Sequence, residues 1–128
     1  MVLTWHFFLI NTSIMPSYAE LHCISNFSFL KGASHPEEMV ERAKTLGYRA
    51  IAITDECSVA GIVRAHVAAQ AAGIQLIIGS EFQLEEGTRF ILIAKNRSGY
   101  GYICNLISTA RRRAPKGDYY LSYKHFVE

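Results

Sequence analysis

Short apolar segments recur along the chain and are too short to be helices. Residues 49–54 and 74–78 are almost wholly apolar, which is typical of parallel strands buried on both faces. Residues 18–23 and 89–94 have strand-like composition as well. The pattern therefore predicts four strands, at 18–23, 49–54, 74–78 and 89–94.

Amphipathic segments lie between or after these strands and are predicted helices. The first begins with a capping box of Ser34 and Glu37 and ends at Gly47. The second covers about 59–72 and the third about 98–113. An order of strand, helix, strand, helix, strand is typical of βαβ units around a parallel sheet, so the predicted fold class is α/β.

The composition is that of an ordinary soluble globular protein. Of the 128 residues 50% are hydrophobic and 19% are charged, which argues against disorder and allows one domain or a piece of one. No apolar run reaches the roughly 18–20 residues that cross a bilayer. The three cysteines contain no CxxC pair, so neither a disulfide framework nor a zinc ribbon is predicted.

Residues 1–14 differ in composition from the remainder of the chain. They are apolar like a signal sequence, but no Lys or Arg precedes the apolar run and no small-residue cleavage site follows it. We interpret Met15 as the natural start and residues 1–14 as an extension outside the fold. A membrane or export segment is the alternative.

Charge is unevenly distributed along the chain. Residues 1–88 hold five Lys/Arg against nine Asp/Glu, a net of −4, whereas residues 89–128 hold eight against two, a net of +6. This asymmetry favours an anionic partner near the C-terminal end. Candidate phosphate contacts for DNA are Arg111, Arg112, Arg113 and Lys116, although cations at a helix C-terminus also simply complement the helix dipole.

Polar side chains stand at the ends of three successive predicted strands. They are His22, Asp55 and Glu81. In a βα barrel the carboxyl ends of the strands converge on one face, where a histidine and two carboxylates suit zinc or manganese. In the alternative interpretation, Asp55 caps the following helix and Glu81 pairs with a nearby basic residue.

Three motifs in order resemble a known family. LHCISNFS at 21–28, AITDE at 52–56 and IGSEF at 78–82 resemble the first motifs of the PHP (polymerase and histidinol phosphatase) domain. Downstream segments at 90–94, 99–102 and 106–113 resemble the version found in bacterial error-prone DNA polymerases, which are similar to the polymerase III α subunit. The resemblance implies that residues 15–128 form the N-terminal portion of a PHP-type (β/α) barrel, incomplete here, with parallel strands and outer helices.

The sequence departs from the family's metal ligands at two positions. Ile24 stands where the first motif carries a second histidine, and Glu56 replaces the histidine of the second motif. The remaining candidates are His22, Asp55 and Glu81, with Glu56 as a harder oxygen ligand. We therefore expect a degraded site that binds zinc or manganese weakly or not at all.

By resemblance, the parent polymerase extends DNA primers and takes part in damage-induced translesion synthesis and repair with other mutagenesis factors in the cytoplasm. Its partners would be DNA and the remainder of the polymerase chain, with no membrane. Polymerase chemistry needs clustered aspartates that hold two metal ions, and the chain contains only Asp55 and Asp118. We expect this chain alone to be inactive and structural. The alternatives are a metal-dependent phosphoesterase of the histidinol phosphatase type and a non-catalytic interaction module.

About three βα units cannot close a barrel. The strands at 51–53 and 74–78 are apolar on both faces, while the helices at 35–46 and 59–72 can cover only the outer face. We therefore expect the isolated chain to be marginally stable, to expose apolar surface and to self-associate.

Overall fold

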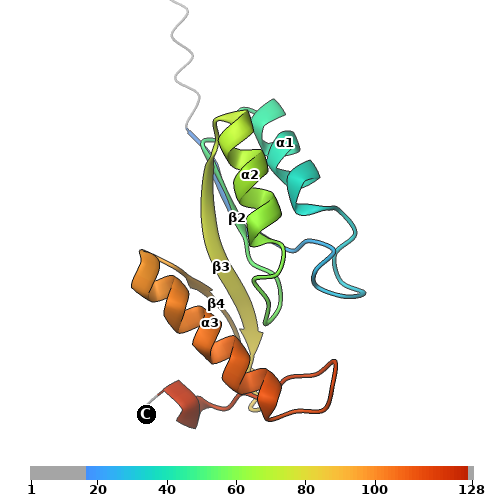
Figure 1. Ribbon diagram of the computed structural model, residues 1–128, viewed down its shortest axis with the longest axis vertical. Coiled ribbons are helices and arrows are strands. Elements are labelled where there is room, and N and C mark those ends of the chain that lie inside the picture. The colour runs from blue at the N-terminus through green and yellow to red at the C-terminus, as the bar shows by residue number, and fades with distance from the viewer. Residues whose placement is uncertain (1–16, 127–128) are drawn as a thin grey trace, which may run out of the picture.

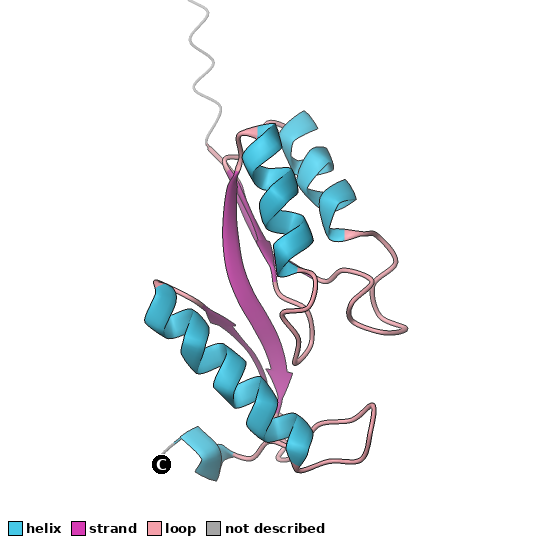
Figure 2. Ribbon diagram, viewed as in Figure 1, coloured by secondary structure: helices cyan, strands magenta, loops and turns pink. Residues whose placement is uncertain are grey.

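A computed structural model describes residues 17–126 of the chain, so the predicted extension at 1–14 lies outside the described residues. Four strands, three α-helices and a short 3₁₀ helix follow one another along the chain (Figure 1, Figure 2). Their bounds are β1 Ala19–Cys23, α1 Pro36–Thr45, β2 Ala50–Ile53, α2 Ile62–Ala72, β3 Gln75–Gln83, β4 Arg89–Ile93, α3 Arg97–Arg112 and η1 Tyr123–Phe126. No helix in this range is long and apolar enough to cross a membrane.

The strands form one sheet in the order β1-β2-β3-β4, and the α/β class and partial-barrel arrangement are confirmed. β1, β2 and β3 run parallel, as predicted from their connecting helices. β4 instead runs antiparallel to β3, with Glu81 opposite Ile91. Only residues 84–88 join these two strands, and a parallel crossover needs a dozen or more. The expectation of a parallel fourth strand was therefore wrong.

β3 is longer than predicted. It extends to Gln83, and its last five residues pair with β4 as one arm of a hairpin. The polar residues Ser80, Glu81 and Gln83 made this stretch look like a loop in the sequence. Backbone pairing with β4 explains why this stretch continues as a strand.

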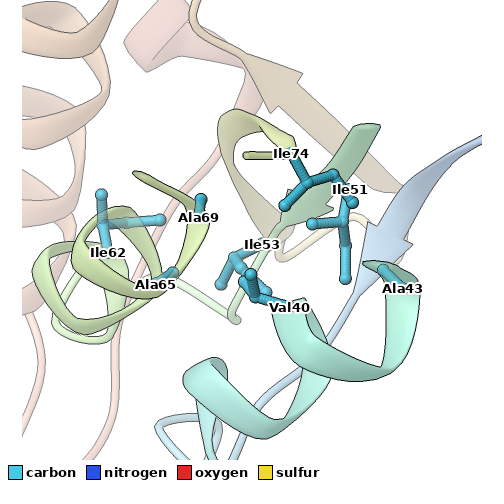
Figure 3. Packing of buried hydrophobic residues seen from close by; sticks show 8 residues of the cluster. All are labelled: Val40, Ala43, Ile51, Ile53, Ile62, Ala65, Ala69 and Ile74. Carbon is cyan, nitrogen blue, oxygen red and sulfur yellow. The ribbon is translucent and has the colours of Figure 1, made fainter. Parts of the chain in front are cut away.

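One core cluster lies between the sheet and the helices α1 and α2. Two small residues of α2, Ala65 and Ala69, are almost fully buried and let this helix approach the isoleucines of β2 closely (Figure 3). The cluster consists of Val40, Ala43, Ile51, Ile53, Ile62, Ala65, Ala69 and Ile74. Burial of such side chains supplies the dominant favourable free energy of folding.

Both of these helices begin later than predicted. The N-cap of α1 is His35 rather than Ser34, because the His35 N–H donates to Oε2 of Glu38 at 2.8 Å and closes the capping box one residue further on. α2 begins at Ile62, since the three residues before it form a turn. Gly73 ends α2 in a left-handed conformation with φ 63°, as its position predicted.

A second core cluster lies between α3 and the β3–β4 hairpin. Phe82 is fully buried, and its ring stacks on that of Phe90 with centroids 5.7 Å apart. Ile103, Leu106 and Ala110 of α3 complete the apolar contact. Even-numbered side chains of β3 thus face the helices, and its odd-numbered ones face the opposite, inner side of the sheet.

The inner side of the sheet carries both apolar and polar groups. The side chains of Leu21 and Ile93 are about half exposed, at 50% and 45%. Glu81 belongs to the inner, odd-numbered set of β3. Glu81 therefore lies on a partly exposed, partly apolar side of the sheet.

Candidate functional site

His22 and Glu81 meet on the inner side of the sheet. The pairing of β1 with β2 shifts between Glu20 and Cys23, and His22 lies in this irregular stretch. Its Nε2 is 2.8 Å from Oε2 of Glu81, two strands away. Cys23 packs against the core beneath α1 and α2. Alternation along β1 thus places the imidazole and the thiol of the next residue on opposite sides of the sheet.

Asp55 follows β2, and its carboxylate is buried against the β1–α1 loop. Its Oδ1 accepts hydrogen bonds from the backbone N–H of Ser25 at 2.7 Å and from Oγ of Ser28 at 2.8 Å. Its Oδ2 accepts from Oγ of Ser25 at 2.7 Å. The residue is 1% exposed. A carboxylate with three such donors organises the loop that leads to α1.

The alternative role for Asp55, a cap for the following helix, was wrong. The N-cap of α2 is Gly61, and no side chain caps that helix end. The Asp55 carboxylate is instead turned toward the preceding loop, where the N–H of Ser25 would otherwise be buried without an acceptor.

Glu56 follows Asp55 and points toward a different set of partners. Its carboxylate forms an ion pair with Nζ of Lys31, and its Oε1 accepts a hydrogen bond from the hydroxyl of Tyr119 at 3.0 Å. Burial alone raises the pKa of Glu56. The hydrogen bonds from Lys31 and Tyr119, with the charges of Lys31 and Arg89, outweigh burial and hold that pKa below its ordinary value.

Glu81 is paired on both of its carboxylate oxygens. Oε2 contacts His22, and Oε1 accepts from Nη1 of Arg89 at 3.2 Å. Nη2 of Arg89 donates to the side-chain oxygen of Gln83 at 2.9 Å. The expectation that Glu81 pairs with a nearby basic residue is therefore confirmed.

The backbone brings these three acidic residues close, but their side chains diverge. Glu56 and Glu81 form a bridge between chain segments, and the N–H of Cys57 donates to the carbonyl of Glu81 at 2.8 Å. Within residues 17–126, no three His, Cys, Asp or Glu side chains converge in a way that could hold a metal ion. Their carboxylate oxygens accept from serines, lysine, tyrosine, histidine and arginine instead. As arranged, this donor set does not fit a divalent ion, and weak binding stays a prediction.

The basic cluster near the end of α3 divides into two parts. Arg111 is turned inward, where Nη2 donates to the carbonyl of Cys57 at 3.2 Å and Nη1 to those of Gly117 and Asp118 at 3.2 Å. Its guanidinium also lies 5.4 Å from the ring centroid of Tyr119. Arg111 thus joins two loops through hydrogen bonds to their carbonyl groups. Three basic residues remain exposed and available to an anion, namely Arg112, Arg113 and Lys116.

Sequence reasoning missed the donors that complete this site. Lys31 and Arg89 are single charged residues in a loop and at a strand start, and nothing in their local sequence indicates a distant carboxylate. Tyr119 contacts Glu56 across 63 positions of the chain. Such pairs depend on the tertiary fold, which a local pattern does not encode.

Comparison with known proteins identifies the family. The model of the PHP domain matches residues 20–127. The chain belongs to the PHP domain family. Curated relatives of this PHP chain are called error-prone DNA polymerase: it is 61% identical over 112 residues to one from Ralstonia nicotianae, and 58% identical over 107 residues to one from Dechloromonas aromatica. Each match covers 84% of the PHP chain but only 10% of the relative, so the chain spans about a tenth of these proteins' length.

Solved structures share the fold. A Bifidobacterium adolescentis protein assigned as a metal-dependent phosphoesterase aligns with a TM-score of 0.55 and 27% identity, over 77% of this chain and 36% of its own. An amidohydrolase from Chromobacterium violaceum, with bound sulfate and no metal, aligns with a TM-score of 0.63 and 23% identity, over 73% of this chain and 33% of its own. The second likeness concerns the fold alone.

Proposed function

We propose that this chain serves as the N-terminal portion of the PHP domain in a polymerase that extends DNA primers during error-prone, damage-induced synthesis and repair. The observation that carries the proposal is the 61% identity to the error-prone DNA polymerase of Ralstonia nicotianae. Its partners are DNA, reached through the complete polymerase, and the remainder of that chain, with further mutagenesis factors in the cytoplasm. The exposed Arg112, Arg113 and Lys116 are the candidate contacts to DNA phosphates.

The role of this portion is structural. Nucleotidyl transfer needs acidic residues clustered around two metal ions. The two aspartates are separated here, because Asp55 follows β2 and is buried against the β1–α1 loop, while Asp118 is exposed in the loop after α3. The acidic residues near the strand ends are held by internal donors, which supports a scaffold that binds zinc or manganese weakly or not at all.

A metal-dependent phosphoesterase is the second candidate. The 27% identity to the Bifidobacterium adolescentis protein favours it. Such chemistry would require Asp55, Glu56 and Glu81 to release their present partners and converge on metal ions. The serine, lysine and arginine contacts described above favour the structural role.

A chimera tests the proposal. Residues 15–128 replace the matching segment of the Ralstonia nicotianae polymerase, and primer extension is measured on undamaged and lesion-containing templates. We expect the chimera to retain activity within a few-fold of the parent and the isolated 128-residue chain to incorporate no nucleotide. A matched chimera carrying Asp55→Ala should lose soluble expression, because the loop that Asp55 organises is part of the scaffold.

Two results would contradict the proposal. One is a folded chimera without primer extension, which would show that this sequence is not interchangeable with the polymerase segment. The other is manganese-dependent phosphatase activity of the isolated chain that disappears in Glu81→Gln, which would favour the phosphoesterase.

A further inference from the structure

We infer that Lys31 and Arg89 are built-in counter-ions that take the place of a divalent metal and neutralise the carboxylates at the strand ends of this PHP chain. The inference deepens the structural role and rests on that proposed function. It gives a role to two residues that were not predicted as metal ligands.

A tightly closed loop places Lys31 next to Glu56. The backbone N–H of Lys31 donates to the carbonyl of Ser28 at 2.9 Å, in the turn that Asp55 organises. Gly32 closes the base of the loop, since a Cβ at that position would lie 2.1 Å from the carbonyl oxygen of Ser25. The loop therefore holds Lys31 over Glu56 by backbone geometry, and only the lysine side chain is free to choose its rotamer.

The β3–β4 hairpin places Arg89 next to Glu81. It is the first residue of β4, lies opposite Gln83 in the register, and reaches Glu81 diagonally across the strands. Its second nitrogen donates to Gln83, so the guanidinium is held at two points. The antiparallel direction of β4 creates this placement. The charge of Arg89 also acts on Glu56, where it contributes to the lowered pKa.

The two cations together carry two positive charges, the charge of one divalent ion. Glu56 and Glu81 are largely buried, with side-chain exposures of 15% and 6%, and buried carboxylates need compensating charge. A metal ion and the two side chains are alternative sources of that charge. Both at once would place like charges within a few ångströms, which is unfavourable in a partly buried site.

This exclusion leads to a direct test with metal ions. The double variant Lys31→Met/Arg89→Met removes two positive charges at the site. A control, Lys95→Met/Arg97→Met, removes two exposed positive charges elsewhere and changes the net charge equally. Binding of Mn²⁺ and Zn²⁺ to the 128-residue chain is measured by calorimetry, and thermal melts are recorded with and without Mn²⁺.

We expect at least a tenfold tighter affinity for Mn²⁺ in the site variant than in the wild type, with a melting temperature that rises on adding Mn²⁺. The control should behave like the wild type. Equal metal affinity in the wild type and the site variant would overturn the inference. A site variant that keeps wild-type stability without metal would overturn it too, because the cations would then compensate nothing.

A second comparison covers the case in which the double variant fails to fold. Lys31→Met alone leaves Glu56 without its cation, whereas Lys31→Met/Glu56→Gln removes the carboxylate charge as well. The inference requires the second variant to be the more stable of the two in urea titrations, and the reverse order would overturn it. Failure of the chimera to extend primers would contradict the proposed function, whereas these metal and stability results bear on the counter-ions alone.

Discussion

Replacement of Asp55 by alanine should destabilise the chain more than most single changes. The substitution removes the acceptor for three hydrogen bonds, from the Ser25 N–H, the Ser25 hydroxyl and the Ser28 hydroxyl. Ser25 and Ser28 are 0% and 3% exposed, so water does not readily replace the carboxylate. The serine hydroxyls can rotate to other acceptors, but the Ser25 N–H is fixed by the backbone.

The magnitude follows from these contacts. Hydrogen bonds to a charged group contribute about 1.5–3 kcal/mol each, and they do not add fully. Leaving the Ser25 N–H buried without its acceptor costs about 1–3 kcal/mol, so the three lost bonds together cost about 3–5 kcal/mol. We expect a loss of that size in the free energy of unfolding, which for a domain of this length lowers the melting temperature by roughly 12–20 °C.

Urea titrations followed by circular dichroism measure this loss, with two further variants for comparison. Asp55→Asn keeps an oxygen for the Ser25 N–H and should lose only about 1–2 kcal/mol. Asp118→Ala alters the other aspartate, which is exposed, and should stay within about 0.5 kcal/mol of the wild type. An Asp55→Ala variant within about 1 kcal/mol of the wild type would refute the reasoning, because the three hydrogen bonds would then contribute almost nothing.

Three further predictions concern the thiols, the acid limb of stability and the inner sheet face. Burial raises the pKa of the Cys57 thiol to about 11, although the charge of Arg111 opposes this shift. Iodoacetamide at about pH 8 should therefore alkylate Cys57 about 100-fold more slowly in the folded chain than in urea. Equal rates would contradict this. The pKa of Glu56 is lowered in the folded chain, so its contribution to the free energy of unfolding is complete above its ordinary pKa of about 4.3. This contribution is lost as the pH falls through the lower folded value. The urea concentration at the unfolding midpoint should therefore decrease once the pH is below about 4.3, and it should decrease less steeply in Glu56→Gln. The half-exposed Leu21 and Ile93 should make the isolated chain bind a hydrophobic dye and sediment as concentration-dependent oligomers, and Leu21→Gln/Ile93→Gln should reduce both; a monodisperse wild type without dye binding would count against an incomplete barrel.

Much of the fold follows from local patterns. The apolar runs at 49–54 and 74–78 both form strands, as their composition predicted. β2 is buried at all four positions, whereas β3 is exposed at Gln75 and only partly buried from Leu76 to Ile78. The direction of β4 was missed because direction depends on the connection, and the polar end of β3 concealed that only five residues remain for it. Strand identity is thus a local property, whereas strand direction depends on the length of the connection.

The sequence indicated which acidic residues lie near the strand ends, but not which basic residues pair with them. His22 and Glu81 do meet, because the local register of β1 and the alternation along β3 turn both side chains to the same side of the sheet. The sequence indicated that Asp55 stands at the end of a strand, but the partners of its carboxylate lie 27 and 30 positions upstream. Side-chain direction within such a loop depends on which donors need an acceptor, and that information appears only once the chain is folded.

The basic residues show why type and spacing alone do not assign a role. Arg111, Arg112 and Arg113 are identical in type and adjacent in sequence, yet only Arg111 faces the protein, where it donates to backbone carbonyls of two loops. A helix turns by about 100° per residue, so neighbours in sequence face different surroundings. Asp55 and Glu56 are also adjacent in the chain, and in the extended segment after β2 their side chains point to different loops. Around this site the fold uses charge mainly to join segments that are distant in the chain.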